Sequence, residues 1–165
     1  MSSRFPRRLK PSFSPREGEG KLDAKKLKLK IAVARWNPTV TGALLASALE
    51  ALERCGARPE DVRVVKVPGA FELPAAARAL MHAGRTDAVV VLGAIVKGET
   101  PHHEVLGHAV ATALANLSAE TGIPIGFGLL TCDTMEQARA RTGKGAEAVE
   151  AAVEMANLRR RLKRR

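Results

Sequence analysis

The 165-residue chain is 45% hydrophobic, which suits one domain with a real core, although only 3% of its residues are aromatic and Tyr is absent. Its net charge of +10 comes from the two ends. Residues 1–30 hold ten Lys/Arg and three acids, and residues 159–165 hold six Lys/Arg and no acid, which leaves residues 31–158 at about −3. Without a basic face or an RNA-module aromatic pattern, we do not expect a nucleic-acid-reading domain. Recruitment of nucleic acid or acidic cargo by the basic tails is the alternative use of that charge.

The two cysteines, Cys55 and Cys132, form no Cys-x-x-Cys or metal-binding spacing and predict free thiols in a reducing, cytoplasmic compartment. No apolar run approaches the roughly 18 residues of a membrane span, and no apolar signal-peptide core is found near the first residue. The composition predicts a basic, flexible N-terminal arm over residues 1–26, a folded domain over 27–158 and a basic C-terminal tail over 159–165.

Apolar runs that read as strands alternate with segments of helical periodicity from Leu27 onward. The strands are predicted at Leu27–Ala34, Val62–Val67, Ala88–Gly93 and Ile125–Thr131, the first near a sheet edge because it alternates with Lys. The helices are predicted at Val40–Cys55, Leu73–His82, His103–Glu120, Thr134–Arg141 and Ala146–Arg160. This alternation predicts right-handed parallel crossovers, and therefore a three-layer α/β/α sandwich.

Ligands of such sheets bind beyond the carboxyl ends of the strands, so the loops that follow the strands locate the site. In the first loop, Trp36 can stack on a heterocycle or simply cover the end of the sheet, and Asn37 can bind polar ring edges. In the second, Glu72 at a helix start is either a ligand-binding carboxylate or an acid favoured by the helix dipole.

The third loop, residues 93–102, combines Gly93, Gly98 and Lys97 with a threonine that can cap the following helix, and so predicts a phosphate cradle. Two histidines, His102 and His103, stand at the mouth of that helix, where an imidazole can transfer protons.

A short predicted helix after the fourth strand carries Arg139, Arg141 and, in its following turn, Lys144. Any of them can reach a phosphate, and an arginine can do so with two parallel hydrogen bonds. A solvated helix face is the alternative for Arg139.

Four ordered motifs resemble the lumazine synthase family over residues 29–158. They are Arg35-Trp-Asn, Pro68-Gly-Ala-Phe-Glu-Leu-Pro, Gly93-Ala-Ile-Val-Lys-Gly-Glu-Thr-Pro-His and Ala152-Val-Glu-Met-Ala-Asn-Leu. The resemblance implies a flavodoxin-like sandwich with a four-stranded parallel sheet. It also implies condensation of 5-amino-6-(D-ribitylamino)uracil with 3,4-dihydroxy-2-butanone 4-phosphate to 6,7-dimethyl-8-ribityllumazine, releasing phosphate and water. A binding protein of the same fold that holds a lumazine or flavin without making it is the alternative.

The resemblance also implies roles for individual residues. His102 matches the proton-transfer histidine, whereas His103 stands at a position that is more often aromatic. Phe127 matches an aromatic that a neighbouring subunit lends to the ribitylaminouracil site. The other matches fall into a group that binds the ribitylaminouracil, namely Trp36, Ala70, Phe71, Glu72, Ala94, Ile95 and Val96, and a group that binds phosphate, namely Glu99, Thr100 and Arg141. Lys144 follows Arg141 more closely than in many relatives, so its match to a further phosphate contact is the weakest of these.

No metal or redox cofactor is implied by the resemblance. The implied partners are the small-molecule substrates and further copies of the chain, because the family builds pentamers with sites between adjacent subunits. In some relatives twelve pentamers form a 60-subunit shell. Riboflavin synthase, which acts next in the pathway, is the candidate protein partner.

Overall fold

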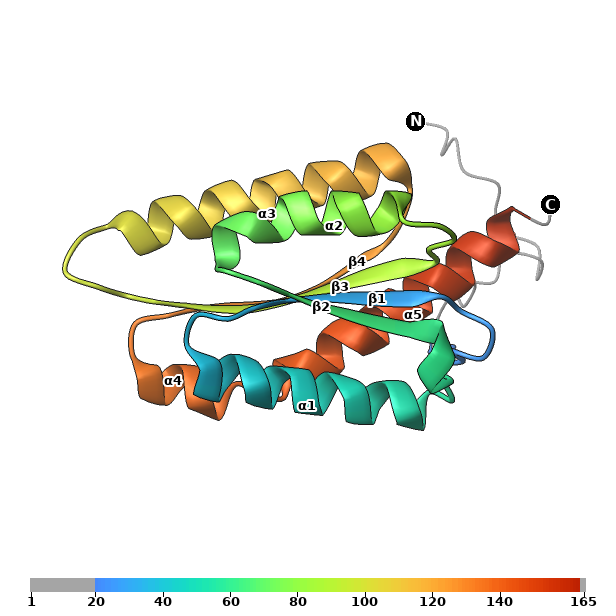
Figure 1. Ribbon diagram of the computed structural model, residues 1–165, viewed down its shortest axis with the longest axis horizontal. Helices are drawn as coiled ribbons and strands as arrows, with labels where there is room; N and C mark the ends of the chain where they lie inside the picture. Colours follow the sequence, from blue (N-terminus) through green and yellow to red (C-terminus); the bar gives the residue numbers. More distant parts are fainter. Residues whose placement is uncertain (1–19, 164–165) are drawn as a thin grey trace, which may run out of the picture.

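The computed structural model describes residues 20–163, which form a four-stranded parallel sheet with helices on both faces (Figure 1). The strands are β1 (Leu29–Ala34), β2 (Val62–Val67), β3 (Ala88–Val96) and β4 (Ile125–Cys132), in the order β2-β1-β3-β4. The helices are α1 (Pro38–Arg54), α2 (Leu73–His82), α3 (His102–Thr121), α4 (Met135–Ala140) and α5 (Lys144–Leu162), with the short 3₁₀ turns η1 (Pro59–Asp61) and η2 (Ala70–Glu72). The predicted α/β/α sandwich is confirmed.

Two apolar clusters lie on opposite faces of the sheet (Figure 1). On one face α1, α4 and α5 pack around Leu44, Leu92 and Val149. On the other face α2 and α3 pack around Leu73 and Leu114. Aliphatic side chains and alanines supply both clusters, as the aromatic-poor composition requires. This arrangement leaves the carboxyl ends of the strands uncovered by helices, where the connecting loops gather.

The position of β1 corrects one expectation, because the strand lies between β2 and β3 rather than at an edge. Its buried Lys30 reaches the end of α2, where Nζ donates to the carbonyl oxygens of Leu80 at 2.8 Å and Ala83 at 2.9 Å. Burial, and then the charge of Arg63, lowers the pKa of this ammonium. A lysine in an interior strand is therefore satisfied by the free carbonyls of a helix C-terminus.

The two chain ends differ in part from their predicted extents. Ala24, assigned from the sequence to the arm, is fully buried, and its N–H donates to the carbonyl of Cys55 at 2.8 Å. The side-chain amide of Asn157 in α5 donates to the carbonyls of Lys21 at 3.0 Å and Asp23 at 2.9 Å. The part of the arm from residue 20 is thus packed against the domain, whereas residues 1–19 lie outside the described residues. Helix α5 starts at Lys144, two residues earlier than predicted, and continues to Leu162.

Candidate active site at the carboxyl ends of the strands

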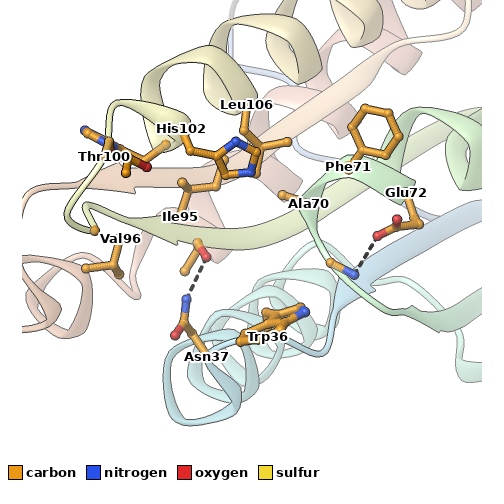
Figure 2. A pocket seen from close by; sticks show the side chains of 14 residues that line it. Trp36, Asn37, Ala70, Phe71, Glu72, Ile95, Val96, Thr100, His102 and Leu106 are labelled. Carbon is orange, nitrogen blue, oxygen red and sulfur yellow. Dashed lines mark hydrogen bonds between the residues drawn. The ribbon is translucent and has the colours of Figure 1, made fainter.

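A cavity of about 520 Å³ opens at the carboxyl ends of β1 and β3, between the start of α3 and the turn η2 (Figure 2). It brings together nine of the thirteen predicted site residues, which come from three different loops. These are Trp36, Ala70, Phe71, Glu72, Ala94, Ile95, Val96, Thr100 and His102. The cavity is where ligands bind in open parallel sheets.

The loop after β1 forms one wall, with an exposed ring and a fixed amide. Trp36 is 72% exposed, so its indole is available to a ligand rather than packed over the end of the sheet. Asn37 adopts a left-handed backbone (φ 56°, ψ 58°), and its Nδ2 donates to the carbonyl of Ala94 at 2.9 Å. A non-glycine residue in this conformation is uncommon and is tolerated best by Asn. The hydrogen bond therefore locks the wall to the floor of the cavity (Figure 2).

The turn η2 forms the opposite wall. The Oε2 atom of Glu72 accepts from the backbone N–H of Gly69 at 2.8 Å, so this carboxylate is engaged with its own turn as well as lining the cavity. Phe71 projects from the same turn and is 71% exposed. A Cβ at position 69 would lie 3.1 Å from Cδ1 of Trp36, so glycine allows the two walls to approach closely.

The end of β3 forms the floor, and the loop beyond it leads to α3. Ala94 and Ile95 are buried, and the N–H of Lys97 donates to the carbonyl of Cys132 at 2.9 Å. Helix α3 begins at His102 with Pro101 as its N-cap, and no side chain caps it, so the prediction that Thr100 caps this helix is wrong. Thr100 is instead exposed at the cavity, beside a helix N-terminus whose first N–H groups favour an anion.

Four predicted site residues do not line this cavity. Glu99 lies exposed on the loop just before Thr100. Phe127, on β4, is 48% exposed and lines two separate grooves, one of which it shares with Lys144. Arg141 follows α4, and its Nη1 donates to the carbonyl of Gln137 at 3.1 Å, whereas Lys144 pairs with Glu147.

The cavity also contains Leu106 and Gly69, for which no role was predicted, together with Gly98 of the predicted phosphate cradle and His103. The sequence holds a cue for Leu106, because it stands four residues after His102 and therefore on the same helix face. Nothing in the local pattern separates Gly69 from an ordinary turn glycine.

Within residues 20–163, no three His, Cys, Asp or Glu side chains gather in a metal-binding group, and no helix is long and apolar enough to cross a membrane. Cys132 is 6% exposed and Cys55 is 7% exposed. Burial is the main cause that raises the pKa of the Cys55 thiol. The ionisable side chains that line the cavity are those of His102, His103 and Glu72.

Comparison with known proteins places the chain in one family. The model of the 6,7-dimethyl-8-ribityllumazine synthase family matches residues 26–160, from just before β1 almost to the end of α5. A protein of Syntrophus aciditrophicus (strain SB), named 6,7-dimethyl-8-ribityllumazine synthase, is 46% identical over 153 residues. That match covers 90% of this chain and 99% of the relative.

Proposed function

Because this chain belongs to the 6,7-dimethyl-8-ribityllumazine synthase family, we propose that it makes 6,7-dimethyl-8-ribityllumazine from 5-amino-6-(D-ribitylamino)uracil and 3,4-dihydroxy-2-butanone 4-phosphate. One observation carries the assignment. A single cavity presents an exposed indole at Trp36, a glycine turn with a carboxylate at Glu72, and an imidazole beside a helix N-terminus at His102 (Figure 2). The indole suits a heterocycle, the glycine turn with its carboxylate suits a hydroxylated chain, and the helix N-terminus beside the imidazole suits a phosphate.

The uracil end of the site is the wall and floor nearest Trp36. The indole provides a flat face for stacking, and the end of β3 provides backbone groups for the polar edge of the ring. The ribityl hydroxyls fit the turn of Ala70, Phe71 and Glu72, where the carboxylate can accept from a hydroxyl while it holds Gly69. These contacts fix the orientation of the ring before the second substrate reacts.

The chemistry then needs several proton transfers but no electron transfer. The primary amine of the uracil attacks the ketone, and loss of water gives an imine. Removal of the neighbouring proton expels phosphate and leaves an enol, which becomes a ketone. The ribityl-bearing nitrogen closes on that ketone with loss of a second water.

His102 is suited to move these protons, because its side chain lines the cavity at the start of α3 and is exposed to the ligand space. One imidazole can give and take a proton in turn, and such general acid–base catalysis contributes typically about 10²- to 10⁴-fold. Holding the two reactants in register adds a further entropic advantage.

The test is turnover of the two substrates, followed by the fluorescence of the lumazine product, with wild-type chain and with His102→Ala. We expect product from the wild type and a loss of kcat of about 10²- to 10⁴-fold in the variant, with binding of a ribityl ligand retained. A wild-type chain that binds lumazine but forms no product would identify a binding protein instead. Unchanged kcat in His102→Ala would remove this residue from the mechanism.

The charge of the cavity supports an assembly in which adjacent protomers share the site. Among the described residues that line the cavity, Glu72 is the one Asp, Glu, Lys or Arg, so a phosphate there needs a cation from elsewhere. Arg141, Lys144 and Phe127 lie outside the cavity of their own chain. We assign Phe127 and Arg141 to the site of a neighbouring protomer in a homopentamer, with Arg141 on the phosphate and Lys144 as its weaker companion.

The proposal also covers the size of the assembly, the cellular location and a protein partner. Light scattering on the purified chain separates a pentamer from a shell of 60 subunits. Both cysteines are unpaired thiols, which fits a cytoplasmic enzyme. Riboflavin synthase, the consumer of the product, is the candidate partner, and co-sedimentation with the assembled particle tests that association.

A further inference from the structure

His103 is a buried titratable side chain in the cavity that the chemistry above does not use. It is 8% exposed, whereas its neighbour His102 is exposed. Its Nδ1 lies 3.2 Å from the carbonyl oxygen of Thr100. Because a carbonyl oxygen can only accept, Nδ1 carries the hydrogen of this bond. The side chain is thus a hydrogen-bond donor aimed at the loop rather than at the ligand.

This side-chain bond stands in place of a backbone hydrogen bond from the N–H of His103 to the carbonyl of Thr100. The carbonyl of Pro101 accepts from the N–H groups of Glu104 at 3.0 Å and Val105 at 3.3 Å, but no backbone N–H among the described residues donates to Thr100. The imidazole satisfies that carbonyl instead. The backbone N–H of His103 itself takes no part in closing the turn, and it stays at the helix N-terminus, where it can bind an anion.

The loop between β3 and α3 is fixed at two points. At its start the N–H of Lys97 donates to the carbonyl of Cys132 at 2.9 Å, and at its end His103 holds Thr100. Between these points Gly98 and Glu99 make no described hydrogen bond, and a Cβ on Gly98 would meet open space. The hydrogen bond from His103 to the Thr100 carbonyl therefore sets the position of Thr100 at the cavity.

We propose that His103 is a positioning residue. Its Nδ1–H holds the Thr100 carbonyl and thereby keeps Thr100 and the first N–H groups of α3 in the arrangement that receives the phosphate of the four-carbon substrate. This role rests on the proposed function above, and it acts through Thr100 without contact with the reacting atoms. It predicts that loss of the donor weakens phosphate binding while the uracil end of the site is unaffected.

The experiment compares three variants. His103→Leu removes the donor, and His103→Asn keeps an N–H at a similar distance from the backbone. His108→Leu removes an exposed histidine of the same helix and is the matched control. The probes are inorganic phosphate, titrated by calorimetry into each assembled protein, and steady-state kinetics with each substrate varied in turn. Thermal unfolding is recorded for all three variants.

We expect His103→Leu to raise the Kd of phosphate and the KM of the phosphorylated substrate by about tenfold, the usual effect of one lost hydrogen bond. The KM of the ribitylaminouracil stays within about twofold, His103→Asn restores most of the loss, and His108→Leu matches the wild type. Unchanged phosphate affinity in His103→Leu overturns the proposal. So does an equal rise in both KM values with a lowered Tm and no rescue by Asn, which is the behaviour of a packing residue.

The two proposals fail in distinguishable ways. If the wild-type chain forms no lumazine, the proposed function fails, while the calorimetric comparison still reports on His103. If the wild type forms lumazine but His103→Leu binds phosphate as tightly as wild type, only the positioning role is lost.

Discussion

The proposed sharing of the active site between protomers predicts that two inactive variants restore each other. His102 lies in the cavity of its own chain, whereas Arg141 lies outside it with its guanidinium on the carbonyl of Gln137. His102→Ala removes the proton-transfer group, at a cost of about 10²- to 10⁴-fold. Arg141→Ala removes up to two charge-assisted hydrogen bonds to phosphate, worth about 1.5–3 kcal/mol each, which is about 10²- to 10⁴-fold as well. Each variant alone should therefore be nearly inactive.

The recovered activity can be calculated from the arrangement. In a ring of heterologous contacts, each site takes His102 from one protomer and Arg141 from the next. An equal mixture of the two variants gives an intact site only where an Arg141→Ala protomer supplies the histidine and a His102→Ala protomer supplies the arginine. For random assembly that occurs at about a quarter of the sites, whatever the size of the ring.

The assay is lumazine formation by the two variants refolded together from denaturant, because separately assembled rings need not exchange subunits. Wild-type chain refolded in the same way provides the reference, and the variants refolded separately and then mixed provide the control. Recovery of about a quarter of the reference activity supports the shared site. Activity no higher than the mean of the two separate variants would show that both residues serve the same chain, and would refute the reasoning.

Two further predictions concern the fold. A Cβ at Gly145 would lie 2.0 Å from the carbonyl oxygen of Leu44, so Gly145→Ala should lower the free energy of unfolding by about 1–3 kcal/mol. A Cβ at Gly42 in helix α1 would meet no atom within 4 Å, so Gly42→Ala should raise the free energy of unfolding by about 0.5–1 kcal/mol. Urea denaturation measures the free energy of unfolding of both variants. A similar change in the two variants would contradict the clash at Gly145. The carboxylate of Asp61 is held by Lys28 and Arg58, which lower its pKa, so it stabilises the fold above its unfolded pKa near 3.8 and loses this effect as the pH falls through the folded value. Asp61→Asn should therefore be less stable than wild type at neutral pH, and the difference should narrow below pH 3.8; a constant difference would exclude the carboxylate as its source.

The strands, the helices and the location of the cavity could be predicted because each depends on local patterns. Apolar alternation and helical spacing can each be recognised within one short stretch of sequence. The parallel topology then places the loops that follow the strands at one edge of the sheet. That is why Trp36, Glu72 and His102, which are far apart in the chain, were expected together and line one cavity. Gly56 and Gly122 stand just beyond the last residues of α1 and α3 and have the positive φ angles that this position favours, which is again a local signal.

The wrong expectation for the first strand comes from a side-chain contact between residues that are far apart in the sequence. Lysines alternating along the first strand indicate an edge because charge at an edge is solvated. Lys30 instead extends its stem to the free carbonyls of α2, fifty residues later in the chain, and so allows an interior strand. The prediction for Thr100 was wrong for a different reason, since Pro101 rather than Thr100 occupies the N-cap position of α3.

The roles proposed for Phe127 and Arg141 require a second copy of the chain. Both side chains are exposed away from their own cavity, and the sequence alone does not show which surface of a second copy they meet.

The two ends of the cavity differ in how completely one chain builds them. At the heterocycle end, the amide of Asn37 holds Ala94 and the carboxylate of Glu72 holds Gly69, so the walls are fixed by bonds within the chain. At the proposed phosphate end, the hydrogen bonds of the loop lie only at its two ends, and the described residues that line the cavity include no Lys or Arg. By the proposal, Phe127 of a neighbouring protomer completes the heterocycle end, so an isolated protomer should lose some affinity for a ribityl heterocycle but should lose more for phosphate. Assembly would then act on the second substrate, because it adds the charge that expulsion of phosphate requires.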